Sequence, residues 1–223
     1  MSSVVLRSIA STHQDDTSTD RMARLDADMR HVLNTLHARR PKRIESLGPA
    51  EARIQPTLHG ALKQLLRDRA TEPGIGMEMR TIPGPAGDIR VRVYVPTALV
   101  GLGPLPMILY LHGGCFVLGS LDQDETPRAL ARKCNAVVVA AHYRQAPEFK
   151  VPAAHQDAYA AWRWMIENAE ALRGSPTHAA AVGEEAGGNL AVYVALSARD
   201  DGGVTPIHLG LVTPMASTDF GRA

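Results

Sequence analysis

The residues best suited to chemistry lie in three short segments, which are rich in glycine or in polar side chains. They read HGGCF at 112–116, YRQAPE at 143–148 and GEEAGGNL at 183–190. A glycine run directly after an apolar strand lets the backbone turn tightly and point several N–H groups into one cleft. Such a cleft stabilises negative charge that develops on an oxygen atom. The first segment therefore predicts an oxyanion hole built from backbone N–H groups.

The third segment predicts a sharp turn from a strand into a helix, with one side chain at its tip. Residues 179–182 form a short apolar run, and residues 188–199 have the length and pattern of a helix. Small residues on both sides of Glu185 leave its side chain room to stand exposed at the helix N-terminus. That position favours a negative charge, because the first N–H groups of a helix lack partners within it. Glu185 is therefore the central candidate site residue.

The elements around these segments predict one α/β core. Continuous apolar runs at 107–111 and 136–140 are typical of strands covered on both faces. Further strands are predicted at 77–82, 89–95 and 207–212, and helices at 126–133 and 153–170. Strands that alternate with helices predict a mostly parallel sheet with helices on both sides. Loops at the carboxyl ends of such strands gather at one edge of the sheet, where open α/β folds place their sites.

The N-terminal part is predicted to be helical after a mobile tail. Residues 1–19 are rich in Ser, Thr and Asp and lack periodicity, which is typical of a tail. Apolar residues recur at helical spacing from Asp20 to Arg40 and again from about Thr57 to Arg69, so we expect an amphipathic helix in each range. A helical segment at 20–72 and an α/β core at 73–223 follow.

Taken together, the three segments resemble the HGGG, DYRLAPE and GDSAGGNLA blocks of hormone-sensitive-lipase-type carboxylesterases. The blocks occur in the same order and at compatible separations, and the similarity extends from about Asp20 to the end of the chain. The resemblance implies the α/β-hydrolase fold, with residues 20–72 as a helical cap over an acyl pocket. In that family the triad acid and base follow the nucleophile along the chain. Because the sequence stops at Ala223, the resemblance also implies a C-terminally truncated core that lacks both.

The resemblance assigns roles to individual residues. The nucleophile position of the G-x-S-x-G motif is occupied by Glu185. The oxyanion hole is assigned to Gly113, Gly114, Cys115 and Ala186. The expected donors are the N–H groups of the last three. Cys115 has less weight, because its backbone is strained or displaced if the glycine that it replaces needs a positive φ. His112 is expected to orient the glycine loop by a hydrogen bond.

A glutamate at the nucleophile position has several interpretations. The favoured one is that the Glu185 carboxylate folds into the hole and inactivates the site, since the same N–H groups bind a resident charge as well as a transient one. The alternative is a covalent carboxylate nucleophile, which would require a positioned base. A metal site formed with His112 and His142 is disfavoured, because His142 starts two strand spacings, roughly 10 Å, from the turn.

Other conspicuous residues have structural interpretations. Cys115 is expected to be a small buried side chain, with a displaced thiolate nucleophile as the less favoured alternative. Asp157 and Glu148 are expected to brace loops by hydrogen bonds. Packing or surface anchoring is expected for Trp162, Trp164 and Met165.

These assignments predict a carboxylic-ester hydrolase for short-chain acyl esters that is catalytically impaired. The alternative is a pseudoenzyme that binds a small apolar ligand or a protein partner without turnover. Neither interpretation requires a cofactor or a metal ion.

The composition narrows the possible partners and location. The chain has 24 basic and 23 acidic residues, so it offers no large field of one sign for nucleic acid or an anionic membrane. Two cysteines make no disulfide framework, and the absence of a signal-like start or a long apolar stretch favours a cytoplasmic protein without a membrane span. The apolar strand at 207–212 is expected to form an open sheet edge, which favours self-association.

Overall fold

The computed structural model describes residues 24–65, 74–99, 101 and 103–217, so the tail predicted at 1–19 lies outside the described residues. Two compact units can be distinguished. One contains the described residues up to 42 together with residues 56–65. The other contains residues 43–55 and the described chain from Gly74 onward. Each unit is described by itself below.

The first unit pairs two helices, α2 (Ala27–Ala38) and α4 (Leu58–Leu65). Helix α2 starts after Asp26, whose side chain accepts a hydrogen bond of 2.8 Å from the N–H of Met29. This cap places the start of the helix later than the predicted Asp20, although residues 20–23 lie outside the described part. The end of the second predicted helix, residues 66–69, also lies outside it.

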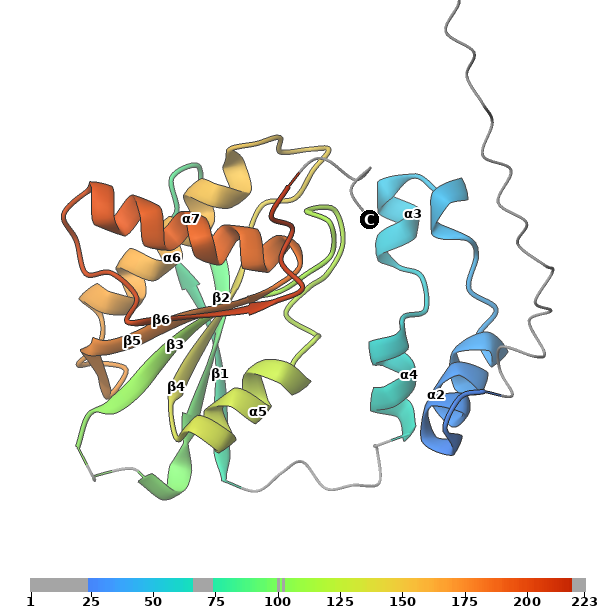
Figure 1. Ribbon diagram of the computed structural model, residues 1–223, viewed down its shortest axis with the longest axis horizontal. Coiled ribbons are helices and arrows are strands. Elements are labelled where there is room, and N and C mark those ends of the chain that lie inside the picture. Colours follow the sequence, from blue (N-terminus) through green and yellow to red (C-terminus); the bar gives the residue numbers. More distant parts are fainter. Residues whose placement is uncertain (1–23, 66–73, 100, 102, 218–223) are drawn as a thin grey trace, which may run out of the picture. The chain divides into compact units, whose positions relative to one another are not determined.

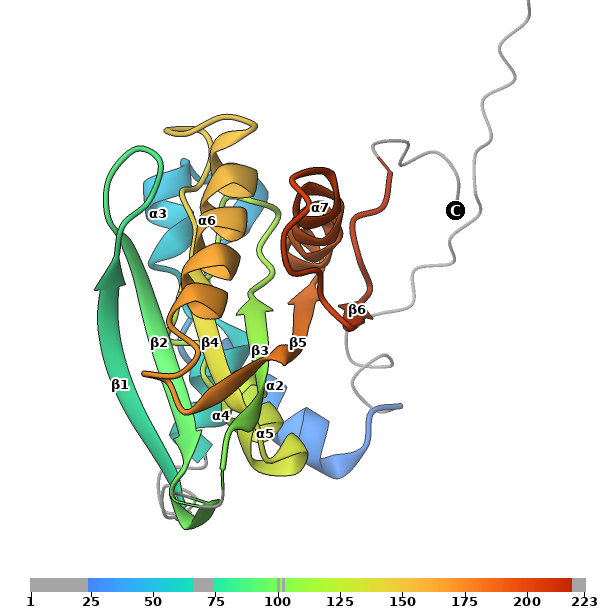
Figure 2. The ribbon, with the colours of Figure 1, turned by 90° about the vertical axis from the view of Figure 1, so that its left-hand side faces the viewer.

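The second unit is built on a six-stranded sheet in the order β1-β2-β4-β3-β5-β6. Its strands are β1 (Ile75–Ile82), β2 (Ile89–Pro96), β3 (Leu105–Leu111), β4 (Val137–His142), β5 (Gly174–Glu184) and β6 (His208–Val212). Strands β4, β3, β5 and β6 run parallel, whereas β1 and β2 pair in antiparallel fashion (Figures 1 and 2). The predicted mostly parallel sheet is confirmed.

Three helices cover the two faces of this sheet. Helix α5 (Glu125–Cys134) lies on one face, and α6 (Ala153–Glu167) and α7 (Ala186–Asp200) lie on the other (Figure 1). Side chains along β3 alternate between the faces: Leu109 packs in the cluster that includes α6 and α7, and Ile108 packs in the cluster on the α5 side. Burial on both faces explains why β3 and β4 appear in the sequence as continuous apolar runs.

Residues 43–55 form two short elements that the sequence analysis missed. They are the 3-10 turn η1 (Ile44–Ser46) and helix α3 (Pro49–Arg53), which begins with proline at its first position. A further 3-10 turn, η2 (Thr97–Leu99), follows β2. Such short turns carry too few apolar residues to produce a periodic pattern. Among the helices of the described ranges, none combines the length and apolarity needed to cross a bilayer.

Candidate active site

Glu185 lies at the sharp turn, or elbow, between β5 and α7, at the position the sequence predicts. It is the residue before the first turn of α7, with φ 50° and ψ −110°. This backbone conformation is strained for a residue with a side chain. The turn is also very tight, because a Cβ atom added at Gly187 would collide with the carbonyl of Leu111, the last residue of β3. Only glycine fits where the helix passes this close to the neighbouring strand.

The backbone of Glu185 is fixed by the last strand and by the segment after it. Its N–H donates to the carbonyl of Val212 at 2.9 Å, and its carbonyl accepts from the N–H of Met215 at 3.0 Å. The same carbonyl accepts from Gly188 and Asn189 in the first turn of α7. Groups on β6 and beyond therefore hold the strained turn in place.

The side chain of Glu185 is bound by the loop that follows β3. Its Oε2 atom accepts hydrogen bonds from the N–H of Gly114 at 2.8 Å and the N–H of Cys115 at 3.2 Å. A Cβ atom added at Gly113 would lie 3.1 Å from the same oxygen, so Gly113 closes the space behind the carboxylate. The third expected donor, the N–H of Ala186, makes no hydrogen bond with this carboxylate within the described chain.

Cys115 contributes a third hydrogen bond and corrects an expectation. Its Sγ donates to Oε1 of Glu185 at 2.7 Å. The residue is exposed, so the small buried side chain expected from the sequence is wrong. The reason is its backbone: a positive φ of 52° turns the side chain toward Glu185 rather than into the core. The hydrogen bond to the carboxylate, with a contribution from partial desolvation, raises the pKa of the Cys115 thiol to about 11.

Opposing effects determine the charge of Glu185. Burial alone would raise the pKa of its carboxyl group, because a charge is poorly solvated there. The hydrogen bonds from the Cys115 thiol and from the N–H groups of Gly114 and Cys115 outweigh burial, and the pKa lies below its usual range. At neutral pH the site therefore contains a carboxylate with acceptor contacts at both oxygens.

His112 is buried at the carboxyl end of β3, next to the loop that binds Glu185. Its Nδ1 lies 2.8 Å from the carbonyl of Gly113, which fits the loop-orienting role suggested by the resemblance. Burial lowers the pKa of His112, so the ring is neutral at pH 7 and Nδ1–H is the donor to that carbonyl. Tyr143 stacks on the ring, with centroids 4.4 Å apart, and donates to the backbone carbonyl of His112.

His142 lies at the end of β4, which β3 separates from the elbow strand β5. Its Nδ1 is 3.3 Å from Nε2 of His112, on the side of that ring away from the Gly113 carbonyl contact. Burial and the nearby cationic groups lower the pKa of His142 to about 4. His142 lines a separate cavity of about 330 Å³ together with Tyr143 and Phe149. Its contacts are thus with His112 and this cavity rather than with Glu185.

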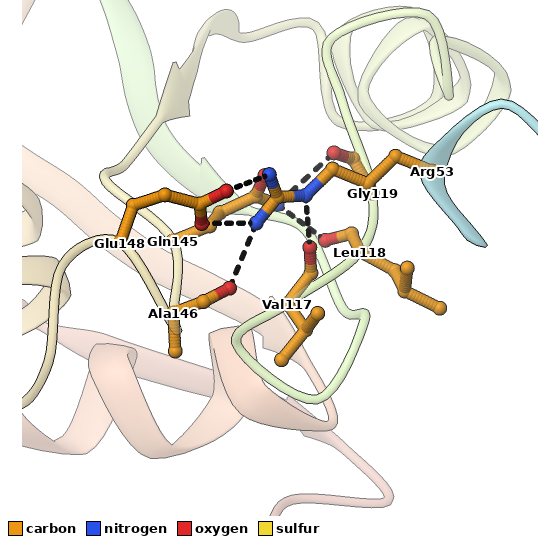
Figure 3. Close-up of polar contacts among 7 residues, drawn as sticks. All are labelled: Arg53, Val117, Leu118, Gly119, Gln145, Ala146 and Glu148. Carbon is orange, nitrogen blue, oxygen red and sulfur yellow. Dashed lines mark hydrogen bonds and ion pairs between the residues drawn. The ribbon is translucent and has the colours of Figure 1, made fainter. Parts of the chain in front are cut away.

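Two acidic residues brace the loops, as expected. Asp157, buried on α6, accepts hydrogen bonds from the backbone N–H and the guanidinium of Arg144. Glu148 forms a bidentate ion pair with Arg53 (Figure 3). Sequence reasoning missed Arg53, because it lies in a short helix without a recognisable motif and its contacts come from residues more than sixty positions away.

The aromatic residues of α6 belong to the core. Trp162 and Met165 are buried, and Trp164 is partly buried against the same cluster. The Nε1–H of Trp162 donates to the carbonyl of Val204 at 2.9 Å, so this helix is also tied to the loop before β6. The packing expected from the sequence is found, and these side chains contribute nothing to the elbow itself.

Known proteins are similar to this chain in sequence and in fold. Residues 108–223 match the family described as alpha/beta hydrolase fold. Carboxylesterase NlhH of Mycobacterium tuberculosis is 43% identical over 162 residues, which cover 71% of this chain and 50% of that protein. Esterase LipI of the same organism is 42% identical over 148 residues, covering 64% of this chain and 46% of that protein. The chain spans about half the length of the curated relatives it matches.

Solved structures of esterases have a similar fold. The hyperthermophilic esterase from the archaeon Pyrobaculum calidifontis superposes with a TM-score of 0.71 at 38% identity, covering 85% of this chain and 59% of that one. The carboxylesterase EstE1, cloned from a metagenomic library, superposes with a TM-score of 0.69 at 37% identity, covering 78% and 57%. The fold, the order of the sequence blocks and these relatives lead to one assignment: this chain belongs to the α/β-hydrolase-fold family, among relatives named as esterases and carboxylesterases.

Proposed function

We propose that this chain is a carboxylic-ester-hydrolase type of protein, suited to short-chain acyl esters, whose elbow is catalytically impaired by Glu185. One observation carries the proposal: the Glu185 carboxylate is bound by the loop that would otherwise receive the acyl oxygen. Its oxygens accept from the N–H groups of Gly114 and Cys115 and from the Cys115 thiol. The relatives' names support the ester class.

The occupied hole disfavours turnover for an electrostatic reason. Ester hydrolysis accelerates when preorganised N–H groups bind the negative charge that develops on the carbonyl oxygen. Here those N–H groups already bind a full negative charge through charge-assisted hydrogen bonds, which are stronger than bonds to a neutral ester carbonyl. A substrate would have to displace the carboxylate before it gained any stabilisation.

Neither side chain at the site is a good nucleophile in this arrangement. Both Glu185 oxygens accept hydrogen bonds, and the lowered pKa reduces the basicity of the carboxylate. Cys115 has a thiol pKa raised to about 11, so it is protonated at neutral pH and lacks the thiolate that attacks acyl groups. Within the described ranges, no histidine hydrogen-bonds the side chain of either residue.

Hydrolysis of p-nitrophenyl butyrate by the purified chain and by Glu185→Ala tests the proposal. We expect the wild type to remain at the rate of buffer, with no gain in Glu185→Ala. Glu185→Ser should stay far from full activity, because an unassisted hydroxyl is a weak nucleophile. Turnover by the wild type that disappears in Glu185→Ala would instead establish a carboxylate mechanism. Glu184→Gln is the matched control, since the Glu184 side chain accepts a hydrogen bond from Tyr110 rather than from the N–H groups that bind Glu185.

Ligand binding tests the assignment of the hole apart from turnover, because removal of the carboxylate frees the N–H groups of Gly114 and Cys115. Thermal unfolding in increasing sodium butyrate measures it directly. In Glu185→Ala the free N–H groups should bind butyrate and raise Tm saturably, whereas the wild type should not respond. A flat response in both proteins would contradict the assignment of the 113–115 loop as an acyl-oxygen hole.

A further inference from the structure

Arg53, the last residue of α3, inserts its guanidinium between two loops of the second unit (Figure 3). It donates to the carbonyl of Val117 through Nε and to the carbonyl of Ala146 through Nη2, each at 2.8 Å. Its Nη1 and Nη2 also donate to the two carboxylate oxygens of Glu148, at 2.8 and 2.7 Å. Four of its five N–H groups are therefore used, which leaves the guanidinium little capacity to bind a ligand.

The loop that Arg53 contacts is the one that holds the Glu185 carboxylate. Val117 lies two residues beyond Cys115, and the three residues just before Val117 have an unusual backbone. Gly114, Cys115 and Phe116 all have positive φ angles, of 128°, 52° and 61°. Two of these residues carry side chains, so the conformation is strained and persists only when surrounding contacts enforce it.

Those contacts reach four successive carbonyl groups of the loop from residues 116 to 119. The carbonyl of Phe116 accepts from the N–H of Ala146, and that of Val117 accepts from Arg53. The next two carbonyls, of Leu118 and Gly119, both accept from the side-chain amide of Gln145 (Figure 3). Arg53 is the one member of this set that comes from outside both loops.

The geometry points to a role for Arg53 as a positioning residue for the oxyanion-hole loop. By joining Val117 to Ala146 and Glu148, it keeps the loop in the strained form in which the N–H groups of Gly114 and Cys115 converge on position 185. The inference rests on the proposed function in taking this loop as the acyl-oxygen hole. The contacts themselves are independent of whether the site turns over an ester.

The ion pair is suited to such a role. The Arg53 side chain is 27% exposed and that of Glu148 49%, whereas the surface pair Arg43 and Glu45 is exposed to 84% and 64%. The hydrogen bonds from Arg53 lower the pKa of Glu148 to about 2, so the pair remains charged at all pH values well above that. Lysine could keep the charge but not the planar fork that reaches two carbonyls and a carboxylate.

Cys115 offers a readout that does not depend on activity. Its thiol is held protonated by contact with Glu185, so a loop that moves away exposes a more ordinary thiol with more thiolate. Cys134 is also exposed but lies on α5, away from the loop, and provides an internal reference. Iodoacetamide labelling at pH 8.5, followed by mass spectrometry of each peptide, gives the ratio of the two rates.

We expect Arg53→Ala to raise the Cys115 to Cys134 ratio about tenfold. Arg53→Lys should give an intermediate rise, and Arg43→Ala, which removes an arginine from the same segment, should give none. An unchanged ratio in folded Arg53→Ala would overturn the inference, as would an equal rise in labelling at both cysteines.

If Arg53→Ala does not fold, Glu148→Gln carries the test, because it removes the charge while keeping the shape of the side chain. The ratio must then rise by a smaller factor, and a folded Glu148→Gln with the wild-type ratio would contradict the positioning role. Failure of the ester-hydrolase proposal would appear in the butyrate assays instead. The two results are therefore separable.

Discussion

The loop at 113–119, which follows β3, and strand β6 lie on opposite sides of β5 and differ in the contacts that they make. The loop meets Glu185 with three hydrogen-bond donors, and the carbonyls from residues 116 to 119 are all paired. Strand β6 pairs with β5 on one side, and its Leu211 and Val212 side chains are 39% and 52% exposed. Both regions support the same turn, since Val212 also binds the N–H of Glu185.

The two regions therefore differ in how firmly neighbouring residues hold their conformation. The conformation of the 113–119 loop is determined by hydrogen bonds to Glu185, Arg53 and Gln145. The β6 side leaves the apolar side chains of Leu211 and Val212 exposed to solvent.

The largest effect is expected from adding one methyl group to a glycine in each region. Gly187→Ala would drive its Cβ into the Leu111 carbonyl, and we expect a loss of about 3 kcal/mol in the free energy of unfolding. Gly210→Ala in β6 would meet the Val182 side chain at 3.0 Å, where a small shift relieves the contact, and about 1 kcal/mol is expected. Urea denaturation measures both. Equal losses would show that the elbow is no more tightly constrained than the edge.

The next largest effect concerns the charge of the Glu185 carboxylate. Glu185→Gln removes the carboxylate that raises the thiol pKa of Cys115 to about 11, so this pKa should fall toward its usual range. More thiolate is then present at any pH below the original pKa, and alkylation at pH 8.5 should accelerate about 30-fold. The pH profile of iodoacetamide labelling gives the midpoint. Glu184→Gln should leave it unchanged, and an unshifted midpoint in Glu185→Gln would contradict the assigned cause.

The smallest effect is expected at strand β6. We propose that the chain self-associates through β6, and that Leu211→Lys weakens this association about tenfold by placing a charge on the strand. Sedimentation velocity over a range of concentrations provides the measurement. Leu196→Lys on α7 is the matched control, because Leu196 is similarly exposed at 45%. A wild-type chain that remains monomeric at high concentration would remove the basis for the edge interaction.

Much of the core was predictable, because buried strands leave a strong signal. The runs at 107–111 and 136–140 correspond to β3 and β4, and every helix predicted after residue 120 is present within a few residues. The position of Glu185 between β5 and α7 also followed from small residues around it. These features depend on local composition and periodicity, which a sequence displays directly.

The contacts that define the site were harder to predict from the sequence. Cys115 was expected to be buried, since cysteine usually is. The resemblance raised a positive φ at this position, but not the contact of the thiol with Glu185. Arg53 and Gln145 act through carbonyl groups of a distant loop, and carbonyls are common to all residues. Such pairings depend on tertiary placement alone. The short helix α3 was missed for a different reason, because five residues cannot establish a period.

The bond between Glu185 and the loop has a consequence for any small molecule offered to this site. Glu185 is an internal ligand attached to its own receptor, so it competes at a high effective concentration, in the millimolar range or above. A dissolved carboxylate or ester at micromolar concentration would leave the occupancy of the loop almost unchanged. Screening of the wild-type chain with dilute compounds would therefore detect no binding at this loop. In Glu185→Ala the same compounds would find its N–H groups free.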